Sequence, residues 1–234
     1  MTRLLVHVEG QTEETFVNEI LSVHLQNRGY ESVSARIIGN ARLRKQRGGI
    51  RPWPPVRRDI VRHLRDDRHC IATTMVDFYA LPEDGAGAWP SRKEANGLRV
   101  PQRARTVERA LLRDVAHKMP ENFDQNRFVP FIVMHEFEGL LFSDCNAFAC
   151  GIAQPEMEAQ FQEIRDGFDT PEHINDSPDT HPSKRIEEIV PDYEKVILGT
   201  LAVLEIGLDR IRQECPHFND WITRLEALTH GHED

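Results

Sequence analysis

The first residues of the chain form a short apolar run that is followed directly by an acidic residue. Residues 4–8 have the length and β-branched content of a buried strand, and Glu9 and Gly10 follow them directly. Thr12, Glu13 and the apolar-periodic segment after them predict a helix with Thr12 as its N-cap. Glu9 therefore lies at the carboxyl end of a strand, where open α/β sheets bind ligands, and Gly10 permits a tight turn. Glu9 and Glu13 could converge on Mg²⁺ or Mn²⁺; alternatively, Glu9 is an ordinary strand-end charge and Glu13 complements the helix dipole.

Strand and helix signals alternate along the first two thirds of the chain. The strand signals share an apolar composition and cover residues 4–8, 32–38, 70–77 and 128–134. Between them, helix signals follow Thr12, begin at Pro54 and Pro55, and cover about residues 101–118. This order predicts an α/β fold with a mostly parallel sheet and helices on both faces. Pro130 predicts an exposed or bulged position in the last strand.

The last third of the chain is helical in pattern and acidic. We therefore expect an α/β domain over residues 1–150 and a helical C-terminal region over residues 151–234 that packs on it. The four cysteines form no Cys-x-x-Cys pair, which argues against a cysteine zinc site. No signal peptide or long apolar span is present, so we expect a cytoplasmic protein with no membrane partner.

The net charge of -9 conceals a basic segment. Residues 36–68 contain eleven Lys or Arg and three Asp, a local net charge of +8, so the rest of the chain carries -17. A basic segment on an acidic body suits a polyanion partner that binds at one face. We predict that Arg42, Arg44, Lys45 and Arg47 bind the phosphates of a nucleic acid. The alternative is a solvated charged loop.

Acidic residues follow three of the predicted strands. Glu9 follows the first, Asp77 ends the third, and Glu136 and Glu138 come after the fourth. Because parallel strands bring their carboxyl ends to one edge, we expect these acids to share a site, and clustered carboxylates need a cation to compensate their repulsion. The sequence thus predicts that Glu9, Glu13, Asp77, Glu136 and Glu138 bind Mg²⁺ or Mn²⁺.

Several segments resemble a known bacterial family. They are residues 8–13, the strand that ends on Asp77, and residues 135–142, 182–185, 193–196 and 215–218. Together they resemble the bacterial domain-of-unknown-function family 4276, over nearly the whole chain. The resemblance implies a Toprim-like fold, the metal-binding fold of topoisomerases, primases and the overcoming-lysogenization-defect nucleases, and a place beside ATPase genes in phage-defence loci.

The resemblance also implies roles for particular residues. Toprim enzymes use a first-strand glutamate and a later Asp-x-Asp pair, and the nucleases add an acid four residues after the glutamate, as in Glu9 and Glu13. Here Asp77 is followed by Phe78 and Tyr79, so the second aspartate is missing. Glu136 or Glu138 could replace it, with Glu136 following the strand more directly and Glu138 closer to related Toprim-like defence proteins.

We therefore expect a Mg²⁺- or Mn²⁺-dependent nuclease of antiviral defence that works with an ATPase partner and cleaves DNA rather than RNA. Glu9 and Asp77 would be catalytic, and Lys184 would stabilise charge on the leaving oxygen. Lys184 could instead be a solvated lysine at a helix start. The alternative for the whole chain is an inactive Toprim-like module that binds or regulates the ATPase.

Overall fold

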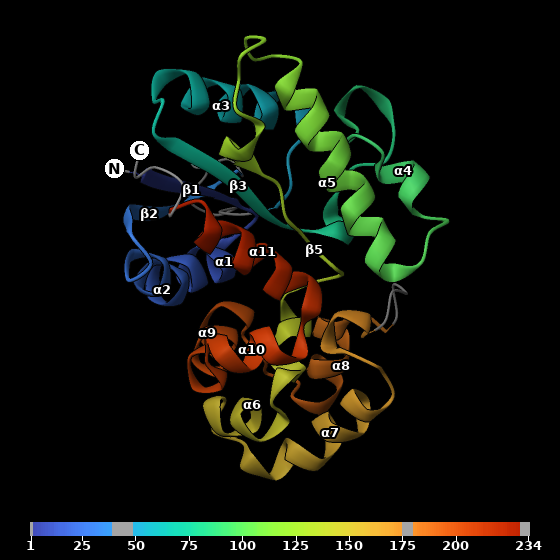
Figure 1. The fold of residues 1–234 in the computed structure, drawn as a ribbon. Helices are drawn as coiled ribbons and strands as arrows, with labels where there is room; N and C mark the ends of the chain where they lie inside the picture. Colours follow the sequence, from blue (N-terminus) through green and yellow to red (C-terminus); the bar gives the residue numbers. More distant parts are fainter. Residues whose placement is uncertain (1, 39–48, 175–179, 230–234) are drawn as a thin grey trace. The chain divides into compact units, whose positions relative to one another are not determined.

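The computed structural model describes residues 2–38, 49–174 and 180–229 (Figure 1). The predicted α/β class is confirmed: a mostly parallel sheet is accompanied by helices, including a helical C-terminal region. The chain divides into two compact units, Met1–Ile132 with Trp221–Asp234, and Val133–Asp220. The boundary that we expected at residue 150 thus falls inside the second unit.

The sheet of the first unit has the order β2-β1-β3-β4, and β5 also pairs with β3. Its strands are β1 (Thr2–Val8), β2 (Tyr30–Ile37), β3 (Cys70–Asp77), β4 (Phe128–Val129) and β5 (Ile132–Val133). β1 is parallel to both β2 and β3, and Val8 is the register partner of Ile37 on one side and Met75 on the other. The carboxyl ends of these three strands therefore lie at one edge.

The single strand predicted over residues 128–134 is wrong, because the chain forms two short strands there. Pro130 has no N–H to donate to a sheet ladder. The backbone at Phe131 bonds to a side chain instead, since the hydroxyl of Thr74 accepts from the Phe131 N–H at 3.0 Å and donates to its carbonyl at 2.8 Å. The backbone N–H and carbonyl of Phe131 thus both form hydrogen bonds inside the core, although the strand is interrupted.

Helices cover both faces of the sheet (Figure 1). They are α1 (Gln11–Phe16) with a π-helical turn at Val17–Leu21, α2 (Ser22–Gln26), α3 (Trp53–Asp66), α4 (Arg92–Ala95), α5 (Val100–Ala116) and the last part of α11 (Pro216–Ala227). α3 and α5 lie on one face, and α1, α2 and the end of α11 on the other (Figure 1). The expected cap at Thr12 is wrong: Gly10 is the N-cap of α1, and the Glu13 carboxylate accepts its N–H.

The end of α11 joins the first unit through buried contacts that are distant in sequence. The Trp221 indole N–H donates to the Thr73 hydroxyl at 2.9 Å, and its ring stacks on Phe131 with the centroids 4.3 Å apart. The Tyr30 hydroxyl donates to the Leu225 carbonyl at 2.8 Å. Buried aromatic side chains with satisfied polar atoms contribute both area and specificity, which explains why this helix end belongs with the sheet.

The second unit is helical and has its own aromatic core. Its elements are a 3₁₀ segment at Phe137–Ser143, α6 (Cys145–Gly151), α7 (Glu158–Asp166), α8 (Pro182–Ile189), α9 (Lys195–Ile206), α10 (Leu208–Glu214) and the start of α11. The rings of Phe148 and Phe161 stack with centroids 4.3 Å apart. α6 and α9 approach closely at Gly151, where a Cβ atom would lie 2.7 Å from the Ala202 Cα.

Within the described residues, no helix combines the length and the apolar character needed to cross a membrane.

Candidate functional site

Two acids lie together at the carboxyl edge of the sheet. Glu9 directly follows β1, Asp77 ends the neighbouring parallel strand β3, and the Asp77 N–H donates to Glu9 Oε2 at 3.4 Å. Both residues are partly exposed. The structure therefore brings Glu9 and Asp77 to one edge, as the strand signals predict. Their role as metal ligands stays a prediction.

Glu13 stabilises the turn that follows Glu9. It is buried, with 6% of its surface exposed, and its carboxylate accepts the Gly10 N–H at 3.0 Å. A carboxylate at this position satisfies one backbone donor at the start of α1 and complements the helix dipole. Glu13 thus positions the Glu9–Gly10 turn, and its role as a ligand stays a prediction.

The backbone after Asp77 is held by a buried arginine that sequence reasoning missed. Arg92 Nε donates to the Phe78 carbonyl at 2.9 Å, and its guanidinium lies 3.8 Å from the centre of the Phe78 ring. Arg92 also pairs with Glu83 at 3.0 Å, although only 3% of its surface is exposed. An arginine within a Gly- and Pro-rich segment gives no sequence signal of burial, so only the fold identifies it.

The acids at the sheet edge fit a magnesium-type cation in their chemistry. Within the described residues, no three His, Cys, Asp or Glu side chains already surround a common point. Mg²⁺ is commonly held by only one or two carboxylates, and water and substrate phosphates complete its octahedron. Glu9 and Asp77, which lie at the ends of neighbouring strands and are partly exposed, offer two such carboxylates.

Glu136 and Glu138 lie in the second unit, where they have contrasting surroundings. Glu136 Oε2 accepts the Ser183 N–H at 3.0 Å and lies 3.1 Å from His181 Nδ1. Burial opposes ionisation of Glu136, but Lys195, Ser183 and His181 together lower its pKa below the usual value. Glu138 is almost fully buried, which raises its pKa, although Lys195 Nζ lies 3.5 Å from its Oε1. Two carboxyl groups and one ammonium thus share a partly desolvated cluster.

This cluster joins three of the segments that carried the family resemblance. Glu136, His181 and Ser183 form hydrogen bonds, but Ser183 Oγ and Glu136 Oε2 both lie at the same ring nitrogen, Nδ1. A serine–histidine–acid relay needs them at opposite nitrogens, so this is no hydrolase triad. Lys195 joins the cluster, whereas Lys184 is half exposed and lies 3.6 Å from Glu187 on its own helix. Sequence reasoning missed Lys195, and the role of Lys184 stays a prediction.

The basic residues Arg42, Arg44, Lys45 and Arg47 lie outside the described residues. Their predicted contact with nucleic acid therefore stays a prediction.

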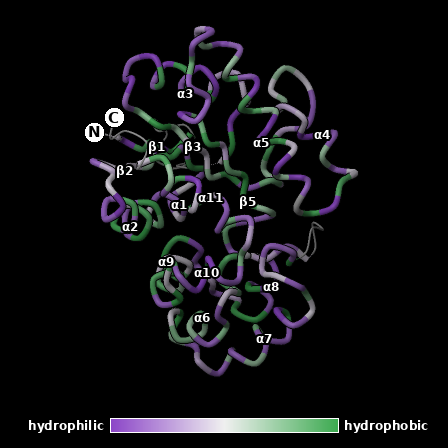
Figure 2. Tube along the Cα trace, in the orientation of Figure 1, coloured by the Kyte–Doolittle hydropathy of each residue, from purple (hydrophilic) through white to green (hydrophobic). Residues whose placement is uncertain are grey.

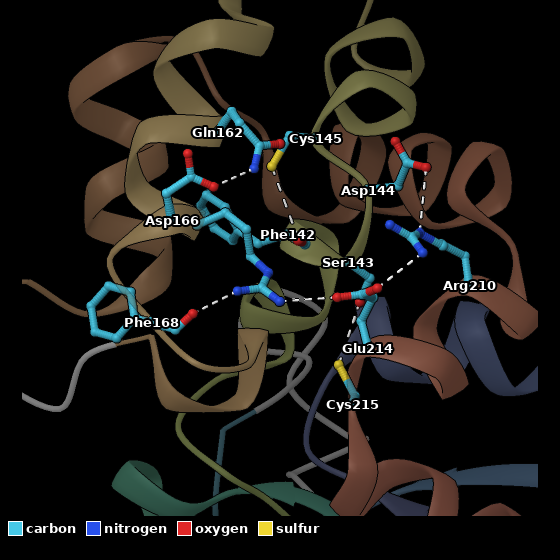
Figure 3. A network of polar contacts seen from close by, with 11 residues as sticks. Phe142, Ser143, Asp144, Cys145, Gln162, Asp166, Phe168, Arg210, Glu214 and Cys215 are labelled. Carbon is cyan, nitrogen blue, oxygen red and sulfur yellow. Dashed lines mark hydrogen bonds and ion pairs between the residues drawn. The ribbon is translucent and has the colours of Figure 1, made fainter.

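A polar cavity of about 250 Å³ lies within the second unit, and Figure 3 shows its network. Arg165 donates to the Phe168 carbonyl at 2.7 Å and to Glu214 at 2.9 Å, and Arg210 donates to the other oxygen of Glu214 at 2.9 Å. Arg210 also lies 3.6 Å from Asp144, so two carboxylates within the unit balance the two guanidinium charges. None of the residues predicted from the sequence to form a site lines this cavity.

Comparison with known proteins gives one match. No curated protein and no solved structure matches the chain. The model of the family described as "Domain of unknown function (DUF4276)" matches residues 8–226, which is nearly the whole chain. The matched range includes the acids at the sheet edge and the Glu136–Lys195 cluster. The chain therefore belongs to the DUF4276 family.

Proposed function

We propose that this protein is a Toprim-like nuclease that hydrolyses phosphodiesters with Mg²⁺ or Mn²⁺, and that it acts on DNA rather than RNA in antiviral defence. The observation that carries the proposal is that Glu9 and Asp77 lie at the ends of two neighbouring parallel strands, where the Asp77 backbone N–H donates to the Glu9 carboxylate at 3.4 Å. An edge of this kind is where α/β proteins bind their ligands. The family resemblance supports the defence role and an ATPase partner.

The residues of the chain have separate tasks in this proposal. Glu9 and Asp77 would hold the cation, which supplies Lewis-acid stabilisation of the phosphodiester when it is bound. The Glu13–Gly10 hydrogen bond fixes the turn after Glu9, and the contact of Arg92 with the Phe78 carbonyl fixes the backbone after Asp77. Both carboxylates are thus supported by neighbours that hold their backbone in place, as a precise cation site requires.

Cleavage of DNA and RNA by the Glu9→Gln variant tests the proposal. Glutamine keeps the size of the side chain and removes its charge, and removal of one preorganised electrostatic group typically slows an enzyme by about 100-fold or more. Glu31→Gln is the matched control, because Glu31 is an exposed acid on β2 of the same sheet. We expect Mg²⁺-dependent DNA cleavage by the wild type and Glu31→Gln and its loss in Glu9→Gln. Equal rates in all three proteins would contradict the proposal.

Capture of nucleic acid is a separate step with its own test. If Arg42, Arg44, Lys45 and Arg47 bind phosphates, changing all four to Gln should weaken binding irrespective of sequence. It should also flatten the slope of log K against log salt by about 0.9 for each lost duplex contact. Equal slopes in the wild type and the fourfold variant would indicate that these residues form a solvated charged loop that does not bind nucleic acid.

The alternative function is an inactive module that binds the ATPase, and two observations favour it. Four apolar residues of α9, Val196, Ile197, Leu201 and Leu204, are 41–56% exposed, and Figure 2 shows the hydrophobic character of this helix. Exposed apolar patches commonly mark protein interaction sites. The presence of Tyr79 in place of the second aspartate of an Asp-x-Asp pair also fits this alternative.

Two variants separate the alternatives. If α9 is the surface that binds an ATPase partner, Leu201→Lys with Leu204→Lys should abolish co-elution with that ATPase. If the module is inactive, Glu9→Gln should protect cells from phage as well as the wild type does. A nuclease predicts that Glu9→Gln loses protection while it still co-elutes with the ATPase.

A further inference from the structure

Two histidines face each other on the α3 side of the sheet. His7 comes from β1 and His63 from α3, and their ring centroids are 5.6 Å apart with the planes tilted by 37°. His7 is 1% exposed. Neither residue has a role in the proposed nuclease.

Both histidines have a buried ring nitrogen that makes no hydrogen bond. His7 Nδ1 lies 3.3 Å from the Thr73 carbonyl oxygen, and this contact requires the proton to be on Nδ1. Nε2 of the neutral ring then carries a lone pair. Among the described residues, neither His7 Nε2 nor His63 Nδ1 has a hydrogen-bond partner. Buried polar atoms nearly always have a hydrogen-bond partner or ligand, so these two nitrogens indicate that an additional group binds to them.

The hydrogen bonding of His7 indicates what that group is. A metal binds the lone pair of a neutral imidazole, and the contact of Nδ1 with the Thr73 carbonyl places that lone pair on the buried Nε2. A histidine that binds a metal commonly donates its other N–H to a backbone carbonyl, which is the arrangement of His7 and Thr73. Imidazole nitrogen suits Zn²⁺, Cu²⁺ and Ni²⁺ better than Mg²⁺.

A carboxylate is available next to the histidines. Asp59 lies one helical turn before His63, on the same face of α3. Its negative charge favours protonation of both imidazoles, so it lies within electrostatic range of both. Its contact with Arg62 is 3.6 Å long and largely exposed, and such pairs contribute little energy. Arg36, the register partner of His7 on β2, opposes a cation here, and Asp59 offsets its charge.

We propose that His7 Nε2, His63 Nδ1 and the carboxylate of Asp59 bind one divalent ion of the Zn²⁺, Cu²⁺ and Ni²⁺ class, separate from the magnesium-type site. Since no three such side chains already enclose a common point in the described part of the chain, Asp59 turns from Arg62 when the ion binds. The ion bridges the strand β1 and the helix α3 and satisfies both unpaired nitrogens.

Titration of the full chain, free of affinity tags, with Zn²⁺ and with Cu²⁺ tests this site. We expect one Zn²⁺ site by calorimetry and, for Cu²⁺, an electron paramagnetic resonance spectrum with coupling to two imidazole nitrogens. His63→Gln should weaken Zn²⁺ binding by at least about 10-fold and remove one nitrogen coupling, because even outer-shell partners of a metal contribute that much. Asp59→Asn should weaken Zn²⁺ binding and keep both couplings.

Two controls make the test decisive. His69→Gln removes an exposed histidine and should bind Zn²⁺ as the wild type does. Glu9→Gln should also bind Zn²⁺ normally, so this site can hold even if the proposed nuclease fails. A wild-type spectrum without two-nitrogen coupling, or equal Zn²⁺ affinity in the wild type, His63→Gln and Asp59→Asn, would overturn the proposal. The wild-type spectrum and Asp59→Asn decide the question even if His63→Gln does not fold.

Discussion

Acidification should destabilise this protein through His7. The buried ring has a pKa of about 3 in the folded chain, against a usual value of about 6.5 in the unfolded chain. Because the folded pKa is depressed, the unfolded chain takes up a proton first as the pH falls below 6.5. Stability is therefore lost progressively between pH 6.5 and pH 3. The linkage relation gives a loss of about 2 kcal/mol between pH 7 and pH 5 from this residue alone.

Urea unfolding at pH 7 and pH 5, followed by circular dichroism in the presence of a chelator, measures this loss. His7→Gln should reduce the difference between the two pH values by about 2 kcal/mol, since glutamine does not titrate. His69→Gln should leave the difference unchanged, because that histidine is exposed. The carboxylates titrate in all three proteins and change their unfolding free energy alike. Their contribution therefore cancels when the difference between pH 7 and pH 5 is compared among the three proteins. An equal pH difference in the wild type and His7→Gln would show that His7 does not cause the loss of stability.

Three further predictions concern the second unit. Gly151→Ala should destabilise the protein by about 1–3 kcal/mol in urea unfolding, because its Cβ would lie 2.7 Å from the Ala202 backbone, whereas Gly97→Ala, which meets nothing within 4 Å, should not. Glu172→Ala should cost about 1–3 kcal/mol, since it removes the carboxylate that accepts two buried N–H groups at the start of α11; an unchanged unfolding midpoint would contradict this. Lys184→Ala should slow DNA cleavage with little change in DNA affinity if this lysine stabilises the leaving oxygen, and an unchanged rate would remove it from the mechanism.

The sequence predicts the sheet and its acidic edge because both follow from local patterns. Apolar runs that alternate with amphipathic helices specify a parallel sheet, and a parallel sheet brings the residues after its strands to one edge. Glu9 and Asp77 lie at that edge for this reason. Local patterns do not specify how proline is accommodated within such a run, and Pro130 divides one predicted strand into two.

Contacts between distant residues were beyond sequence reasoning. The end of α11 packs on the sheet through the hydrogen bond between Trp221 and Thr73. These residues are 148 positions apart in the sequence, and no local pattern predicts that contact. The burial of Arg92 and the pairing of Lys195 with the buried Glu138 have the same origin, because a charged residue that pairs within the fold has the same local sequence as a solvated one. Sequence reasoning therefore selected Lys184, the lysine next to a helix-start motif.

Binding of Mn²⁺ is the most direct test of the account, because the proposed chemistry depends on a cation at Glu9 and Asp77. Titration of the wild type with Mn²⁺, followed by electron paramagnetic resonance, should reveal a bound ion. In Glu9→Gln and in Asp77→Asn its affinity should fall by at least about 10-fold, since each change removes one of few protein ligands, while Glu31→Gln should bind as the wild type does. Mn²⁺ affinity that is the same in all four proteins would show that Glu9 and Asp77 do not hold the cation.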